Sequence, residues 1–202
     1  MRVRAVFVDF GGVIMRTEDK GPRSRQAERL GMTSRDLEKI VFESDSSLRA
    51  STGEISEEAH WQAVSKALGV DRQEGEKIIT EFFSGDRVDT VLLDFLRSLR
   101  PDRKVGLISN SWSGLRKVVT TNQFADVFDE MVISAEVGLV KPDPRIYQLA
   151  LERLGVHPKE SVFLDDMLIN VEAARSLGMS AIQFTQPGST LEELKHFLID
   201  TG

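Results

Sequence analysis

The chain has 202 residues, of which 41% are hydrophobic, so it can bury a full core as one large domain or one domain carrying an insert. Its formal charge of −6 comes without a basic stripe, which argues against a nucleic-acid partner. It contains no cysteine, which excludes disulfides and thiolate chemistry. No run approaches the roughly 18 apolar residues of a membrane span, so we expect no membrane association and a cytoplasmic protein.

The first predicted element is a buried strand over residues 4–8, which ends on Asp9 and is followed at once by Gly11 and Gly12. Parallel sheets keep their binding crevices at the carboxyl ends of their strands. A carboxylate at such a place is a candidate metal ligand or nucleophile.

The next stretch, residues 16–86, carries helical patterns and no strand signal. Gly31, Gly53 and Gly69 divide it into predicted helices over 24–30, 34–43, 54–68 and 72–83. An insertion directly after the first strand would lie over the carboxyl edge of the sheet, where it could act as a lid or specificity cap. We therefore expect a helical cap domain at 16–86 and a core domain formed by 1–15 and 87–202.

The rest of the chain alternates helices and short apolar runs. Strands are predicted at 104–108, 131–134, 161–164 and 181–184. Helices are predicted at 88–99, from Pro144 to Leu154, at 169–177 and from a capping box at Ser189 onward. Continuous apolar strands between helices indicate an α/β fold with a parallel sheet that is covered on both faces.

Polar residues of particular types follow the predicted strands. Asp9 follows the first strand, Ser109 and Asn110 the second, Lys141 the third, and Asp165-Asp166 the fourth. Such a set suits phosphoryl transfer, which needs a nucleophile, groups that hold phosphate oxygens, a cation and carboxylates for a hard metal ion. Mg²⁺ is the natural choice, because it prefers oxygen ligands and takes only one or two carboxylates.

The same set, in this order, resembles the four motifs of the haloacid dehalogenase superfamily. The motifs are Asp-Phe-Gly-Gly-Val from Asp9, Ile-Ser-Asn from Ile108, Lys-Pro-Asp-Pro from Lys141 and Phe-Leu-Asp-Asp from Phe163. The resemblance implies a Rossmann-like core of five parallel strands with a helical cap after the first strand. It is closest to sugar-phosphate phosphatases and to the phosphatase-like N-terminal domain of soluble epoxide hydrolases.

Carried over residue by residue, the resemblance implies a phosphatase that acts on a small phosphorylated metabolite. Asp9 would attack phosphorus and form an aspartyl-phosphate, which water then hydrolyses. Lys141 would act beside it, and Ser109 and Asn110 would bind phosphate oxygens. The remaining implied roles are Mg²⁺ coordination by Asp9, Asp166 and the carbonyl of Gly11, and support of the site by Asp165 and Asn170.

Gly11 departs from this pattern. Phosphatases of the superfamily usually carry a second aspartate at this position, which acts as acid and base, and such assistance is worth roughly 10²–10⁴ in rate. The enzyme could use substrates with good leaving groups, such as anomeric or acyl phosphates. Another group could instead supply the proton; Glu18, Asp19 and His60 are conceivable.

Two other functions stay open because of Gly11. The superfamily's 2-haloacid dehalogenases also lack this aspartate, since halide needs no acid, although they usually carry an aromatic residue there. The chain could also be a catalytically weak binding or regulatory protein. The sequence does not reveal the substrate or the oligomeric state.

Two features near the cap have both a structural and a functional interpretation. Trp112 follows the phosphate-binding pair and could wall the pocket or pack under the cap. A local basic cluster is expected to be a solvated face that an anionic part of a substrate could use. It comprises Arg16, Lys20, Arg23, Arg25 and Arg29.

Overall fold

The computed structural model describes residues 2–200, and its centre is a five-stranded parallel sheet in the order β5-β4-β1-β6-β7. This confirms the predicted α/β fold. The strands are β1 (Ala5–Val8), β4 (Lys104–Ser109), β5 (Glu130–Ile133), β6 (Ser161–Asp165) and β7 (Ser180–Gln183). Every prediction for these strands agrees with the structure to within one residue at each end.

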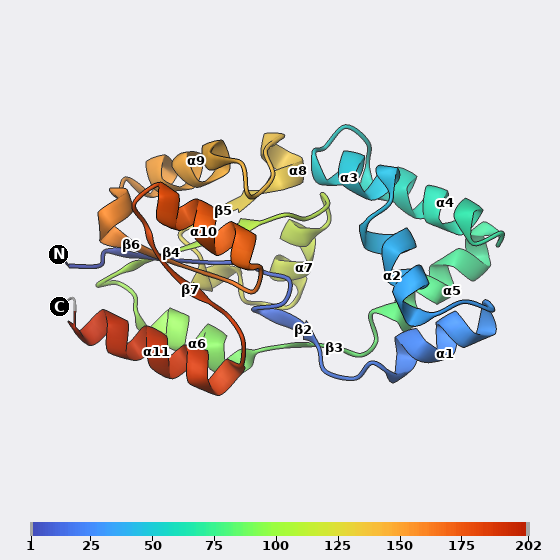
Figure 1. Cartoon of the computed structure of the whole chain (residues 1–202), viewed down its shortest axis with the longest axis horizontal. Coiled ribbons are helices and arrows are strands. Elements are labelled where there is room, and N and C mark those ends of the chain that lie inside the picture. Colours follow the sequence, from blue (N-terminus) through green and yellow to red (C-terminus); the bar gives the residue numbers. More distant parts are fainter. Residues whose placement is uncertain (1, 201–202) are drawn as a thin grey trace.

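Helices cover the sheet on both faces, which explains why its strands are continuously apolar. In β1, Val6 and Val8 belong to one buried cluster, while Ala5 and Phe7 belong to the other. Figure 1 shows the helices in two layers, with α9 and α10 on one side and α6 and α11 on the other. Their bounds are α6 (Thr90–Ser98), α9 (Pro144–Leu154), α10 (Leu168–Ser176) and α11 (Pro187–Asp200).

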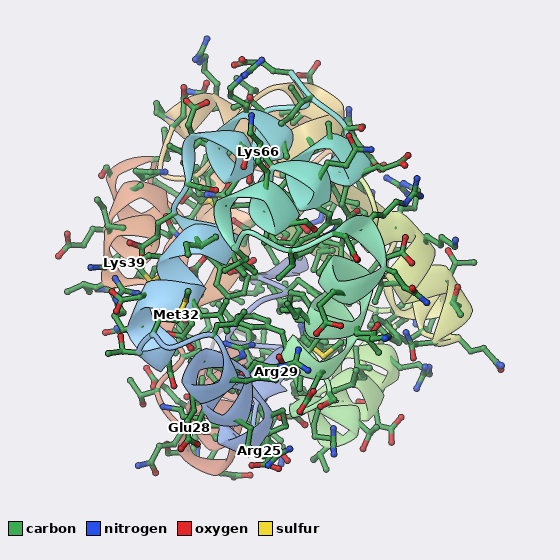
Figure 2. The ribbon with its side chains drawn as sticks, turned by 90° about the vertical axis from the view of Figure 1, so that its right-hand side faces the viewer. Arg25, Glu28, Arg29, Met32, Lys39 and Lys66 are labelled. Atoms are coloured by element: carbon green, nitrogen blue, oxygen red, sulfur yellow. The ribbon has the colours of Figure 1, made fainter. Side chains whose placement is uncertain are left out.

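Five helices inserted after the first strand form a separate layer beyond the carboxyl ends of the strands (Figure 1). In Figure 2 this layer faces the viewer and lies in front of the sheet. The helices are α1 (Gly21–Arg29), α2 (Ser34–Phe42), α3 (Asp45–Ser51), α4 (Glu57–Ala67) and α5 (Arg72–Phe82). The three glycines that were expected to separate helices all have a left-handed backbone, with φ of +69° to +75°.

The insertion also contains elements that the sequence did not indicate. Helix α3 has only seven residues and was not predicted. The expectation of no strand signal is wrong at both ends of the insertion, where β2 (Met15–Thr17) pairs antiparallel with β3 (Asp86–Val88). These strands are too short, and too mixed in polarity, to show a period of two. They form the two connections between the helical layer and the sheet (Figure 1).

The start of the last helix was also predicted wrongly. Helix α11 begins at Pro187, and the Ser189 hydroxyl donates to the carbonyl of Gln186 at 3.4 Å. Ser189 therefore lies in the first turn, because a proline with its fixed φ already starts the helix. Shorter elements complete the core: α7 (Leu115–Thr121), α8 (Ser134–Val137), η1 (Ala125–Val127) and η2 (Pro158–Glu160). Within residues 2–200, no helix is both long and apolar enough to cross a membrane.

Candidate active site

The register of the sheet brings the predicted site residues to one edge. Val8 pairs with Leu107 of β4 and with Leu164 of β6, so the next residue, Asp9, lies beside Asp165. The Asp9 amide donates to the Leu164 carbonyl at 2.8 Å, which extends the ladder to the end of β1. Strands that end together in a parallel sheet thus place two carboxylates side by side.

Lys141 lies between these two carboxylates. Its Nζ is 2.9 Å from Asp9 Oδ1 and 2.6 Å from Asp165 Oδ2. The Lys141 side chain is 1% exposed and the Asp165 side chain is completely buried, so the charges interact with little screening by water. The ammonium also lies 5.4 Å from the centre of the Phe163 ring. Lys141, from the third motif, is therefore in direct contact with Asp9, the predicted nucleophile.

The second oxygen of Asp165 is also engaged. Oδ1 accepts hydrogen bonds from the Met167 amide at 2.8 Å and from Asn170 Nδ2 at 2.9 Å. Asn170 is in turn fixed by Tyr147, whose hydroxyl donates to the Asn170 carbonyl at 3.1 Å. Asp165 is thus oriented toward Lys141 by its neighbours, and the buried Tyr147 is a supporting residue that the sequence analysis missed.

Asn110 fixes the backbone of the Lys141 loop. Its Nδ2 donates to the Lys141 carbonyl at 2.9 Å, and its Oδ1 accepts from the Lys141 amide at 2.7 Å. A similar reciprocal pair joins Ser111 and Ser134: the Ser111 amide donates to Ser134 Oγ, which donates to the Ser111 carbonyl. Asn110 therefore positions the Lys141 loop, a role that the sequence did not indicate. Ser134 was not predicted as a supporting residue, because nothing in its local sequence marks it.

Three carboxylates are close enough to share a cation. Ligand oxygens of Asp9, Asp165 and Asp166 all lie within 4.8 Å of one another. Burial, together with repulsion from Asp165, raises the pKa of Asp9 to about 6, although Lys141 opposes this rise. The same two causes raise the pKa of Asp166.

This donor set fits a hard divalent cation. Three carboxylates face one ammonium, so the cluster lacks positive charge, and repulsion from Asp165 adds to burial in raising the pKa values of Asp9 and Asp166. Both oxygens of Asp165 already have partners, which leaves Asp9 and Asp166 as the carboxylates better placed for a metal ion. Carboxylate oxygens are the ligands that Mg²⁺ prefers.

The two glycines after Asp9 differ in their surroundings. Gly12 has a φ of +77°, and a Cβ atom built there would lie 2.3 Å from Asp166 Oδ2. Gly11 has no left-handed backbone, and a Cβ atom built there would meet no atom within 4 Å. Gly12 thus allows the loop to approach Asp166 closely, a role that the sequence analysis missed although the glycine pair marked the place.

The remaining predicted residues differ in how directly they meet this cluster. Ser109 is the last residue of β4 and is buried at the same edge of the sheet. Trp112 packs against the helical layer, stacked on Phe42 with a centroid distance of 6.0 Å and edge-on to Trp61 at 4.9 Å. These contacts agree with the packing interpretation of Trp112.

The basic cluster near the helical layer is largely neutralised. Arg23 is buried, and its guanidinium contacts Asp86 at 3.0 Å and Glu38 at 3.3 Å. Arg25 and Arg29 lie along α1 in Figure 2 and are ion-paired with residues of α5. Most of this cluster holds α1 against its neighbours, which removes the main reason to expect an anionic part of the substrate there.

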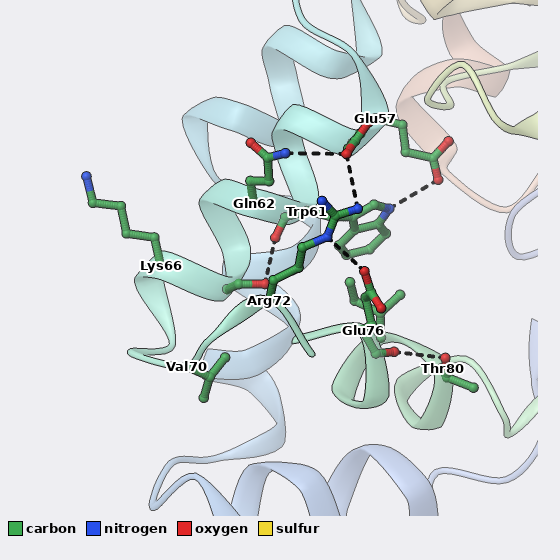
Figure 3. Close-up of a pocket in the computed structure, with 11 residues that line it drawn as sticks. Glu57, Trp61, Gln62, Lys66, Val70, Arg72, Glu76 and Thr80 are labelled. Atoms are coloured by element: carbon green, nitrogen blue, oxygen red, sulfur yellow. Dashed lines mark hydrogen bonds and ion pairs between the residues drawn. The ribbon is translucent and has the colours of Figure 1, made fainter. Parts of the chain in front are cut away.

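A hollow of about 700 Å³ lies between α4 and α5, away from these residues. Figure 3 shows Arg72 between the two helices, near Trp61. The guanidinium is paired with Glu76 at 3.0 Å and with Glu58 at 3.4 Å. None of the predicted site residues lines this hollow, so the acidic edge of the sheet stays the candidate site.

Comparisons with known proteins agree with the geometry. A family model for haloacid dehalogenase-like hydrolases matches residues 3–178. Rat bifunctional epoxide hydrolase 2 is 31% identical over 140 residues, which cover 65% of this chain and 25% of the relative. A Mycobacterium tuberculosis protein named Phosphatase MT3486 is 34% identical over 101 residues, which cover 49% of this chain and 46% of that protein. The chain therefore spans less than half of either relative.

A solved structure extends the similarity to almost the whole chain. It is a haloacid dehalogenase family enzyme from Bacteroides thetaiotaomicron in complex with magnesium and inorganic phosphate. The TM-score is 0.77 at 25% identity, and the match covers 92% of this chain and 96% of that one. Together with the family model, this shows that the chain belongs to the haloacid dehalogenase-like hydrolase family.

Proposed function

We infer that the chain is a Mg²⁺-dependent phosphatase of a small phosphorylated metabolite, with Asp9 as the nucleophile. The observation that carries this proposal is the contact of Asp9 with Lys141 inside a cluster of three carboxylates. The magnesium and phosphate bound to the similar Bacteroides enzyme support the same chemistry. No particular substrate is implied.

In the proposed reaction, an oxygen of Asp9 attacks phosphorus in line with the leaving group and forms an aspartyl-phosphate. Lys141 neutralises charge on the phosphate oxygens. Asp165 holds the Lys141 ammonium in place, and Asn170 orients Asp165. Ser109 and Asn110 border the phosphate position at the end of β4. Asp9, Asp166 and the carbonyl of Gly11 would hold Mg²⁺, which supplies further neutralisation of the phosphate charge when bound.

In the second step, water attacks the phosphorus of the aspartyl-phosphate. The Asp9 carboxylate then departs as a weak base, so it needs no proton. The Asn110 contacts keep Lys141 in the same place during both steps. The site is thereby returned to its starting state.

We further propose that residues 16–86 form a cap and that residues 1–15 and 87–202 form the core. The five helices of this stretch lie together beyond the carboxyl ends of the strands, which supports the division. Substrate selection would then depend on the surfaces that the helices present to the edge of the sheet.

The carboxylate cluster favours a phosphatase over a dehalogenase. Displacement of halide requires no cation, whereas three carboxylates with one ammonium form a site with unbalanced negative charge. A dehalogenase would release halide from short 2-haloacids without metal. A flat halide-electrode trace with these compounds is the result that the phosphatase proposal predicts.

The test of the proposal is phosphate release from p-nitrophenyl phosphate, measured with Mg²⁺ and with excess EDTA. We expect release only with Mg²⁺ and its loss in Asp9→Asn, which keeps the shape of the side chain but removes the nucleophile. An Asp71→Asn variant is the matched control, because Asp71 caps α5 and asparagine caps equally well. Activity that persists in Asp9→Asn would show that the proposal is wrong.

A further inference from the structure

The absence of a side chain at Gly11 has no structural cause. Gly12 needs to be glycine, because its φ is +77° and a Cβ atom would collide with Asp166. At Gly11 the backbone is not left-handed, the residue is exposed, and a Cβ atom would meet nothing within 4 Å. Neither the conformation of the loop nor its packing therefore requires a glycine at this position.

Lys141, the cation that contacts Asp9, lies beside the attacking group and is poorly placed to protonate a leaving group. In an in-line displacement, the leaving oxygen departs from the side of phosphorus opposite the attacking oxygen. Lys141 touches Asp9 itself at 2.9 Å and is shared with Asp165 at 2.6 Å. A proton donor for the leaving oxygen must come instead from the loop after Asp9 or from the helical layer.

The three donors considered from the sequence, His60, Asp19 and Glu18, each make a contact elsewhere, while His60 Nε2 is buried without a hydrogen-bond partner. His60 is completely buried between Trp61 and Trp112, and its Nδ1 is 2.9 Å from Ser46 Oγ. Asp19 Oδ1 accepts from the Gly21 amide at 2.8 Å. Glu18 is an exposed partner of Arg16 at 3.6 Å. Among the described residues, none of the three has a hydrogen bond or ion pair with Asp9, whose charged partner is Lys141.

We propose that this site acts on phosphates whose leaving group departs without a proton, and that its natural substrate class is the acyl phosphates. The proposal rests on the phosphatase function inferred above. Asp9 forms a bond to phosphorus while the bond from phosphorus to the acyl oxygen breaks, and its electron pair leaves as a carboxylate. Water then releases phosphate from Asp9 and gives up one proton to solvent.

The missing acid affects only the first step, in which the leaving group departs from phosphorus. Departure of an alkoxide, which is a strong base, would lose the roughly 10²–10⁴-fold assistance of a general acid. A carboxylate leaving group loses nothing, since it is already stable without a proton at neutral pH. In the second step Asp9 itself is the carboxylate leaving group and needs no acid, whereas the attacking water lacks the base that an aspartate at position 11 would supply.

The test measures kcat/KM with Mg²⁺ for acetyl phosphate, p-nitrophenyl phosphate, phenyl phosphate and ethyl phosphate. For the wild type we expect kcat/KM to fall steeply as the leaving group becomes more basic. Gly11→Asp places a carboxyl group in the open space and should raise the ratio of the ethyl phosphate value to the acetyl phosphate value roughly 10²-fold. Gly11→Asn adds the same volume without an acid and should give no such gain.

Two results would overturn the proposal. One is a wild-type kcat/KM for ethyl phosphate within about tenfold of that for acetyl phosphate, since a missing acid costs more than this. The other is an equal gain in Gly11→Asp and Gly11→Asn. Failure of the phosphatase function itself looks different, because then none of the four compounds releases phosphate in an Mg²⁺-dependent manner. The wild-type series needs no variant to fold, and thermal melting checks both variants.

Discussion

Two adjacent glycines after β1 show how closely residue type and geometry are linked at this site. Alanine at position 12 would adopt a left-handed backbone, which costs a non-glycine residue about 1–3 kcal/mol, and would displace Asp166. Alanine at position 11 would have neither problem.

We therefore expect Gly12→Ala to lower the free energy of unfolding by about 1–3 kcal/mol and Gly11→Ala to change it by no more than about 0.5 kcal/mol. Urea denaturation measures both. Equal losses in the two variants would contradict the assigned difference between the glycines. The comparison is well matched, since both changes add one methyl group to the same loop.

At the level of residues, sequence reasoning identified the charged groups better than their supports. Asp9 and Asp165 lie at the ends of neighbouring strands, which groups them, while Lys141 lies in the loop after α8 and was grouped with them by its motif. Tyr147 and Ser134 act through hydrogen bonds to distant backbone atoms. Such contacts depend on how helices and loops pack, and no local pattern encodes them.

At the level of elements, the site joins the ends of β1 and β6, where Asp9 and Asp166 lie. A cation that binds both carboxylates also holds these two ends together, so it stabilises the folded state by mass action. We expect Mg²⁺ to raise the melting temperature at pH about 7.5. The increase should be largely lost in Asp166→Asn and retained in the Asp71→Asn control.

The stabilisation by Mg²⁺ should become smaller as the pH is lowered. Because the pKa of Asp9 in the metal-free chain is about 6, against an ordinary value of 3.8, a proton competes with the cation below that pH. Between these two pKa values the folded state binds more protons than the unfolded state, so the metal-free chain itself loses stability as pH rises. An Mg²⁺ effect that is as large at pH about 5 as at 7.5 would contradict this account.

The predicted elements agree with the structure where the apolar pattern is clear, and they fail where a short element is mostly polar. The strands of the sheet are continuous apolar runs, and α9 has the predicted bounds, Pro144–Leu154. Helix α3 and the strands β2 and β3 are too short to develop a period. They are defined by contacts with other elements instead, as β2 and β3 are by their pairing with each other.

At the level of the whole molecule, the helical layer meets the core at a few close contacts. A Cβ atom at Gly53 would lie 2.3 Å from the Ala135 carbonyl, and one at Gly114 would lie 2.1 Å from Glu57 Oε2. Trp112 adds an aromatic contact to Phe42 from the loop after β4. The insertion could be predicted from the sequence, but these contacts could not, because they depend on how the layer is placed over the sheet.

A phosphoryl group that passes through Asp9 can be trapped chemically on this residue. The chain would be mixed with acetyl phosphate and Mg²⁺, quenched in acid and reduced with borohydride, which converts an aspartyl-phosphate to homoserine. Peptide mass spectrometry then locates the product. We predict homoserine at position 9, dependent on Mg²⁺ and absent from Asp9→Asn. Phosphate release with an unmodified Asp9, or with homoserine at another position, would contradict the account.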